Sequence, residues 1–152
     1  MQDGGFLLSN SLPQPPHGPA FRTIPHRNRV LIVDDNYSVR QALIEIFKRE
    51  ADFDVCGEAG NGHEAIRVAQ LLSPDLIVLD LAMPVMNGLD AARMLRRLMP
   101  AVPLIMYSGI GDRLVEQQAR LIGIAALISK AEAPGTLVGK ARVVLGQRAA
   151  TP

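Results

Sequence analysis

The sequence predicts a doubly wound α/β fold, in which helices cover both faces of a single parallel sheet. From residue 29 onward, short continuous apolar runs alternate with segments whose apolar residues recur at helical spacing. Continuous apolar runs are typical of strands covered on both faces, and their alternation with helices favours a parallel sheet. Five strand–helix units fit between residues 29 and 147, which corresponds to a (βα)5 three-layer sandwich.

The five predicted strands are short, and one of them differs from the rest. It alternates apolar and polar side chains, a pattern that suits the edge of a sheet. In chain order the runs are Val30–Val33, Phe53–Cys56, Leu76–Leu79, Leu104–Met106 and Ala125–Ile128. With the alternating run Phe53–Cys56 at an edge, we expect the strand order 2-1-3-4-5, which is that of flavodoxin-like folds.

Each predicted strand is followed by a stripe of apolar residues at helical spacing. Ser38 and Gln41 form a predicted capping box at the start of the first helix, and the fourth stripe is the weakest. The stripes are Val39, Ala42, Leu43, Ile46 and Phe47; Ala65, Val68, Ala69 and Leu72; Ala91, Met94, Leu95 and Leu98; Val115, Ala119 and Ile122; and Leu137, Ala141, Val144 and Leu145.

Length and composition narrow the classes of protein that the chain can be. Its 152 residues fit one domain, with residues 1–28 as a proline-rich disordered arm and residues 148–152 as a tail. The net charge of +1 gives no reason to expect nucleic acid or a membrane surface as a direct partner. The single cysteine, Cys56, excludes an internal disulfide. No apolar stretch approaches the ~20 residues that span a bilayer, so we expect a soluble cytoplasmic protein.

Polar side chains follow the strands at their carboxyl ends, where ligands bind in open α/β sheets. The first strand is followed by Asp34 and Asp35, the third by Asp80, the fourth by Ser108 and the fifth, one residue on, by Lys130. Carboxylates gathered this closely repel one another unless a cation intervenes, and oxygen ligands favour a hard ion such as Mg²⁺. With a lysine and a hydroxyl beside it, such a site suits phosphoryl transfer to a carboxylate nucleophile.

On these residues the sequence resembles the response-regulator receiver family of two-component systems. The matching segments are Val30–Asp35, Ala59–Ala65 and Asp75–Gly88, together with Ser108 and Lys130. By this resemblance Asp80 is the phospho-acceptor, and Ser108 and Lys130 contact the phosphoryl group. Asp35, Asp80 and the backbone carbonyl of Ala82 hold Mg²⁺, which Mn²⁺ could replace, and Asp34 contributes through a water molecule.

The resemblance also implies a mode of action. The phosphoryl donor is a sensor histidine kinase or a histidine phosphotransfer protein, and phosphorylation shifts the conformation around the fourth and fifth helices. The chain is then a signalling domain with slow self-dephosphorylation and not an enzyme in the usual sense. Homodimers through the face of the fourth and fifth helices are common in the family, although no residue of this sequence specifies one.

Three positions depart from the family's commonest pattern. Gly109 follows Ser108 where alanine is more usual, and Ala131 follows Lys130 where proline is frequent. Leu127 stands where many members carry a switch aromatic, and Tyr107 is a candidate to replace it. Gly109 and Leu127 put the usual coupling between the hydroxyl and the aromatic in doubt, but none of the three removes the phosphorylation chemistry.

Several alternatives remain open. The segment Lys130–Leu137 resembles the corresponding turn in regulators with a C-terminal helix-turn-helix domain, so the chain can be the receiver of a transcription regulator. A non-phosphorylated docking module would normally have lost one of the acids or the lysine. A haloacid-dehalogenase-type phosphatase would need an aspartate at Ala82.

Two local motifs are less informative than they look. Gly60–Ala65 imitates a dinucleotide fingerprint but is better explained as a glycine turn with a helix cap. The arginines of residues 93–97 are predicted to be solvated helix surface.

Overall fold

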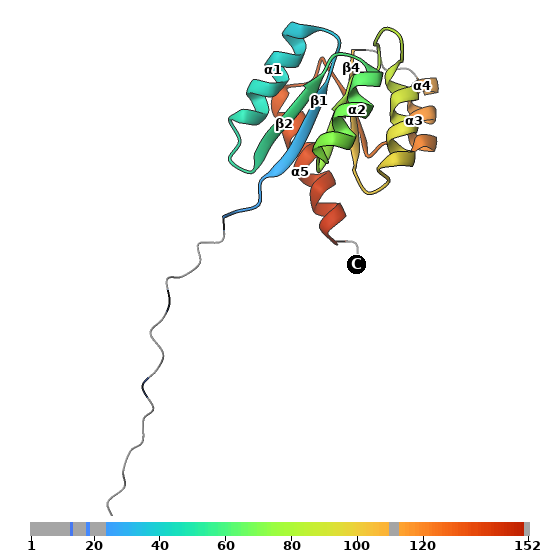
Figure 1. Ribbon diagram of the computed structural model, residues 1–152. Coiled ribbons are helices and arrows are strands. Elements are labelled where there is room, and N and C mark those ends of the chain that lie inside the picture. The colour runs from blue at the N-terminus through green and yellow to red at the C-terminus, as the bar shows by residue number, and fades with distance from the viewer. Residues whose placement is uncertain (1–12, 14–17, 19–23, 110–112, 151–152) are drawn as a thin grey trace, which may run out of the picture.

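The chain folds as one parallel sheet between two layers of helices. The computed structural model describes residues 13, 18, 24–109 and 113–150, with side chains described up to residue 147. In these parts of the chain, five strands lie in the order β2-β1-β3-β4-β5, and each strand is followed by a helix (Figure 1). The predicted fold class and strand order are therefore confirmed.

The elements lie close to the predicted positions. The strands are β1 (Asn28–Val33), β2 (Phe53–Ala59), β3 (Leu76–Leu79), β4 (Leu104–Ser108) and β5 (Ala126–Ser129). The helices are α1 (Tyr37–Lys48), α2 (Gly62–Leu72), α3 (Gly88–Leu98), α4 (Arg113–Ile122) and α5 (Pro134–Ala150). The predicted arm lies largely outside the described residues, and α5 includes the first three residues of the predicted C-terminal tail, residues 148–150.

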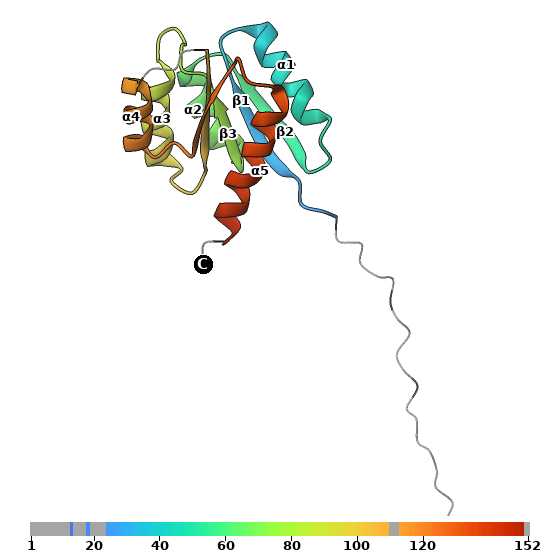
Figure 2. The same cartoon turned by 180° about the vertical axis from the view of Figure 1, so that it is seen from behind.

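Two apolar clusters fill the space on either side of the sheet. On one face α2, α3 and α4 pack against alternate residues of the strands, among them Leu31, Ile77 and Met106. On the other face α1 and α5 pack against the residues between them, such as Ile32 and Ile105 (Figure 2). Because successive side chains of a strand point to opposite faces, the continuous apolar runs serve both clusters at once.

The alternating strand β2 lies at an edge of the sheet, as predicted. The opposite edge strand, β5, differs from its prediction as a fully covered strand. Ile128 is its one buried residue, whereas Ala126 and Leu127 are only partly buried. The physical reason is that α4 covers this end of the sheet loosely, since Ala119 is the one residue of α4 that is buried. The weak apolar stripe of this helix is consistent with that loose packing.

The start of α1 corrects one prediction. Asn36, and not Ser38, caps the helix, and its side-chain oxygen accepts a hydrogen bond from the backbone N–H of Val39 at 3.1 Å. The helix begins two residues earlier than a cap at Ser38 would allow, so Ser38 lies within its first turn. The buried face of the helix is formed by Leu43, Ile44 and Phe47, so Ala42 of the predicted stripe is exposed and Ile44 is buried instead.

Phe47 anchors the layer formed by α1 and α5. Its side chain is fully buried, and its ring meets that of Phe53 edge-on, with centroids 5.1 Å apart. Edge-to-face aromatic pairs add to the free energy gained by burial alone. Phe53 in turn lies beneath the guanidinium of Arg142 on α5, at 5.7 Å from the ring centroid. The contact between α1 and β2 is thereby linked to α5.

We predict that Phe47→Ala lowers the free energy of unfolding by about 3–5 kcal/mol, because it removes a buried ring and leaves a cavity. Chemical denaturation followed by circular dichroism measures this loss. The control is Leu71→Ala on α2, where the native side chain is 72% exposed and a change within about 0.5 kcal/mol is expected. Equal effects of the two substitutions would contradict the packing described for α1.

Candidate functional site

The candidate site lies at the carboxyl ends of β1 and β3, which are neighbours in the sheet. Val33 pairs with Leu79 at the end of this ladder, so the next residues, Asp34 and Asp80, leave the two strands side by side. The backbone N–H of Asp80 donates to the carbonyl of Val33 at 2.9 Å, which extends the pairing into the site. Carboxylate oxygens of Asp34, Asp35 and Asp80 lie within 4.8 Å of one another. The predicted convergence of the three acids is confirmed.

Asp34 is the most deeply buried of the three acids, and both of its oxygens are already engaged. Oδ1 accepts a hydrogen bond from the backbone N–H of Asn36 at 2.8 Å, and Oδ2 accepts one from Nζ of Lys130 at 2.9 Å. Asp35, by contrast, is exposed. The buried acid therefore organises the loop and the lysine, whereas the exposed acid is accessible from solvent.

Lys130 is the cation of the site and bridges two of its acids. Its Nζ lies 3.2 Å from Oδ1 of Asp80, in addition to its contact with Asp34. Burial by itself would lower the pKa of Lys130, but the hydrogen bond to Asp34 and the charges of Asp80 and Asp34 outweigh it, so the pKa is raised. The ammonium group is therefore firmly charged.

The surroundings of Asp80 raise the pKa of its carboxyl. Burial raises the pKa of its carboxyl, and the charge of Asp34 raises it further, whereas Lys130 and a backbone hydrogen bond from Ala82 act in the opposite direction without cancelling the rise. A carboxylate held in this way is stabilised by any additional cation. The oxygen-only donor set fits a hard divalent ion.

Ser108 ends β4, the strand next to β3. Its side chain is buried, and its carbonyl accepts a hydrogen bond from the backbone N–H of Lys130 at 2.8 Å. This bond fixes Lys130 relative to the end of β4 and so to the neighbouring acids. Of the residues predicted for the site, the three acids lie together, and Lys130 contacts Asp34 and Asp80. Ser108 lies at the end of β4, and Ala82 lies in the loop after β3, where its backbone N–H donates to Asp80.

The chain matches the response regulator receiver domain over residues 30–142. This is most of the sequence. The chain belongs to the response regulator receiver family. Receiver domains accept phosphoryl groups from histidine kinases and bind Mg²⁺ at an acidic pocket, and this chain has an acidic cluster formed by Asp34, Asp35 and Asp80.

Relatives of known function share this domain. The chemotaxis protein CheY of Thermotoga maritima is 36% identical over 110 residues, which cover 72% of this chain and 91% of that protein. A protein-glutamate methylesterase/protein-glutamine glutaminase of Pyrococcus abyssi is 40% identical over 99 residues, 65% of this chain. The chain spans 27% of that relative's length, so the match concerns the receiver part alone.

Solved structures give the same result. The response regulator domain of Thermotoga maritima CheB superposes with a TM-score of 0.75 at 29% identity and covers 80% of this chain and 98% of that domain. A LuxR-family two-component response regulator from Aurantimonas has a TM-score of 0.77 at 26% identity, with coverage of 80% and 87%. No helix in the described part of the receiver is long and apolar enough to cross a membrane.

The loop between β3 and α3 holds the receiver's Asp80 in place. The N–H of Gly88 donates to the carbonyl of Leu81 at 2.8 Å, and a Cβ atom at Gly88 would lie 2.1 Å from the carbonyl oxygen of Asp80. Only glycine allows this approach. Within the loop, Val85 has a φ of 69° and an exposed side chain, an unfavourable backbone conformation for a β-branched residue. The loop thus combines close backbone packing with local strain.

Arg40 is a residue of this region that the sequence analysis missed. Its Nη1 donates to the backbone carbonyl of Asp34 at 2.8 Å, and its guanidinium lies over the ring of Tyr37 at 5.4 Å. Glu58 lies 3.7 Å from its Nε. The side chain therefore joins the loop after β1 to the end of β2. The available signal was an arginine one turn into the helix that follows the acidic pair.

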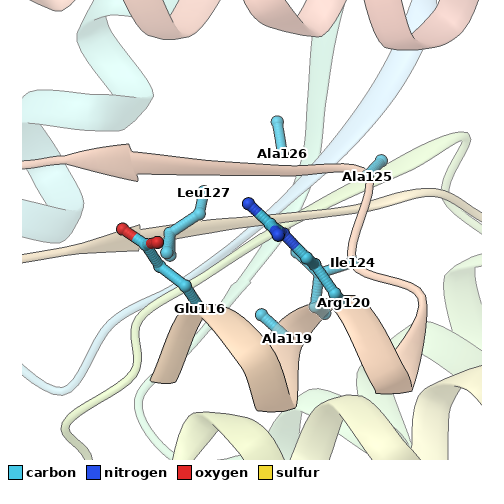
Figure 3. Close-up of a pocket in the computed structure, with 7 residues that line it drawn as sticks. All are labelled: Glu116, Ala119, Arg120, Ile124, Ala125, Ala126 and Leu127. Carbon is cyan, nitrogen blue, oxygen red and sulfur yellow. The ribbon is translucent and has the colours of Figure 1, made fainter. Parts of the chain in front are cut away.

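The position of the usual switch aromatic, Leu127, departs from the family pattern, as the sequence indicated. Leu127 is partly buried and lines a pocket of about 340 Å³ between α4 and β5, together with Glu116 and Arg120 (Figure 3). Tyr107 does not replace the missing aromatic in this pocket. It belongs to the apolar cluster on the opposite face of the sheet, where its ring lies 6.0 Å from Nζ of Lys130.

Gly88→Ala is expected to lower the free energy of unfolding by at least about 2 kcal/mol and to weaken Mg²⁺ binding, because the added Cβ displaces backbone next to Asp80. Thermal denaturation and calorimetric Mg²⁺ titration measure the two effects. Gly139→Ala is the matched control, since nothing lies within 4 Å of a Cβ at this position of α5. The control is expected to stabilise the helix by up to about 1 kcal/mol. Unchanged Mg²⁺ affinity in Gly88→Ala would contradict the role given to this loop.

The raised pKa of Asp80 predicts how stability depends on pH without metal. A carboxyl whose pKa is higher in the folded chain than in the unfolded one makes folding less favourable as pH rises through that interval. In EDTA at neutral pH, Asp80→Asn is therefore expected to melt at a higher temperature than the wild type. The difference should shrink as pH falls towards the ordinary carboxyl value of about 4. A variant that melts at a lower temperature at neutral pH would contradict this assignment.

Proposed function

We propose that this receiver takes up a phosphoryl group on Asp80 from the phosphohistidine of a sensor histidine kinase or a phosphotransfer protein. The observation that carries the proposal is the bridging of Asp34 and Asp80 by Lys130, at 2.9 and 3.2 Å. It leaves Asp80 as a buried, charge-strained carboxylate beside a fixed cation. Such a group is stabilised when its charge moves onto phosphoryl oxygens that the lysine can contact.

The residues support a particular division of roles at the metal. Both oxygens of Asp34 accept hydrogen bonds, from Asn36 and Lys130. We therefore assign Asp34 an indirect role through water, and we assign direct coordination to Asp35, Asp80 and the carbonyl of Ala82. Mg²⁺, or Mn²⁺ in its place, would neutralise charge on the phosphoryl oxygens.

The proposed phosphoryl transfer has two reactants, the receiver and its phosphohistidine donor. A carboxylate oxygen of Asp80 forms a bond to phosphorus while the bond between phosphorus and the donor's imidazole nitrogen breaks, and the imidazole leaves with the bonding electrons. Lys130 then pairs with a phosphoryl oxygen, and the Ser108 hydroxyl donates to another. Water slowly hydrolyses the resulting acyl phosphate, which returns Asp80 to its starting state. The chain is thus an acceptor that is regenerated slowly.

The loosely packed edge of the sheet is the part that responds. Lys130 follows β5, and α4, which precedes β5 in the chain, has Ala119 as its one buried residue. When Lys130 exchanges a carboxylate for a phosphoryl partner, β5 and α4 are the elements with the weakest packing to resist a shift. The pocket beside Leu127 provides room for this movement. A homodimer formed through the α4 and α5 face would be sensitive to this movement and could transmit the signal.

A second candidate is the receiver of a DNA-binding regulator. The segment Lys130–Leu137 resembles the turn before α5 in such regulators, and the LuxR-family regulator from Aurantimonas superposes with a TM-score of 0.77. In this arrangement the receiver would control a helix-turn-helix domain elsewhere in the same protein. A longer reading frame that encodes such a domain would distinguish this candidate from a single-domain regulator.

The test is intact mass spectrometry after incubation with acetyl phosphate, with and without Mg²⁺. We expect the wild type to gain the mass of one phosphoryl group only with Mg²⁺, and Asp80→Asn to gain none. Lys130→Met, in a sample whose folding is checked by circular dichroism, is expected to lose most of the response, because the phosphoryl group then has no cation from this lysine. Asp90→Asn, an acid on the exposed surface of α3, is the control and should label fully. Labelling that persists in Asp80→Asn would assign the acceptor to another residue.

A further inference from the structure

A groove between α3 and α4 is not used by the phosphorylation chemistry. It has a volume of about 400 Å³ and is lined by Arg93, Arg96, Arg97, Gln118, Leu121 and Ile122. Three of these side chains are cationic and none is acidic. The lining residues belong to the second halves of the two helices, away from the loop that carries Asp80. We call this surface the α3–α4 groove.

The three arginines differ in how far they are engaged within the fold. Arg96 is structural, since its Nη1 donates to the carbonyl of Pro100 at 2.7 Å and its guanidinium packs against Gly123. Arg93 makes an exposed ion pair with Asp90 at 2.7 Å, and such a pair holds its partners weakly. Arg97 is exposed and makes no ion pair with any residue that the structure describes. Arg93 and Arg97 are therefore available to an outside anion.

The groove also presents apolar surface that the fold leaves uncovered. Leu121 is 88% exposed, and Leu114, seven residues earlier on the same side of α4, is 62% exposed. A single exposed leucine is ordinary, but here two share a helix face that adjoins a groove lined by arginines. Arginine beside exposed apolar side chains is a composition typical of interfaces between proteins.

We propose that the α3–α4 groove docks an acidic amphipathic helix of a partner protein. Apolar residues of that helix would cover Leu121 and Ile122, and its carboxylates would pair with Arg93 and Arg97, in some cases by two hydrogen bonds each. The charge of the groove selects an acidic partner, and the leucines select an apolar stripe on it.

Two other occupants fit the groove less well. A second copy bound through the same surface would set the arginines of one chain against those of the other, which is unfavourable. Nucleic acid would pair with the arginines but gain little from covering Leu114 and Leu121. The small net charge of +1 also provides no wider basic surface to follow a phosphate backbone.

The probe for this proposal is a synthetic helical peptide of about 18 residues, with leucines at helical spacing and glutamates elsewhere. We expect it to bind the full chain at least about tenfold more tightly at low salt than the same peptide with lysine in place of glutamate. Fluorescence anisotropy gives the affinities, and amide chemical shifts locate the site. Peptide binding that is absent, indifferent to peptide charge, or located outside α3 and α4 would overturn the proposal.

Paired variants test whether the named residues carry the binding. Arg97→Glu and Leu121→Gln are each expected to weaken it by about tenfold, while leaving the melting temperature unchanged because both side chains are exposed. Arg67→Glu and Leu71→Gln make the same changes on the exposed face of α2 and should have no effect. Equal effects of the two pairs would overturn the assignment to the groove. The proposal would also be overturned if duplex DNA displaced the peptide and this displacement required Arg97.

The outcome is independent of the phosphorylation site. Asp80→Asn, which abolishes phosphorylation under the proposed function, should bind the acidic peptide with the affinity of the unphosphorylated wild type. A chain that binds the peptide but is never phosphorylated would refute the proposed function alone. A chain that is phosphorylated but does not bind the peptide would refute the docking surface alone.

Discussion

The arrangement of this receiver depends on one constraint, the repulsion among three carboxylates gathered within 4.8 Å at the carboxyl ends of β1 and β3. Asp34 and Asp80 are almost fully buried there, and an unpaired buried charge is very unfavourable. Lys130 meets the constraint by reaching past β4 to both acids. One ammonium group thereby ties the last strand of the sheet to the first and the third.

The same constraint makes the site responsive. Three carboxylates and one lysine leave an excess of negative charge. Under the proposed function, a divalent cation relieves this excess and phosphorylation of Asp80 then rearranges it. Any rearrangement acts on Lys130 first, because it contacts two of the acids. Since Lys130 follows β5, the change reaches the part of the sheet where packing is weakest, and the tightly packed layer of α1 and α5 is not its first target. Charge at the carboxyl ends of the central strands is thus coupled, through Lys130, to the loosely packed edge strand β5.

The sequence predicted the elements whose environment is uniform. Continuous aliphatic runs such as Leu76–Leu79 are covered on both faces, so their pattern alone specifies a central strand. The acids and the lysine were predictable because they directly follow such strands, or lie one residue beyond them, and parallel strands bring their carboxyl ends together. The cap of α1 was not, because Asn36 and Ser38 are both good caps and the choice depends on where the loop after Asp34 closes. That loop is held by a hydrogen bond from the side chain of Arg40, within the helix, back to the carbonyl of Asp34, which the pattern of capping residues does not reveal.

Surfaces were the least predictable feature, and the α3–α4 groove explains why. On the sequence, the arginines of α3 are a small basic face and Leu121 is one apolar residue of a weak helix. Neither pattern indicates more than a solvated helix surface. Their significance arises from the packing of two helices separated by β4, which sets Arg97 across from Leu121 in one groove. Because Ala119 is the one buried residue of α4, most side chains of this helix are constrained little by the core. Core packing therefore does not dictate which residues occupy these positions, and binding to another molecule can do so. This is the property expected of a recognition surface.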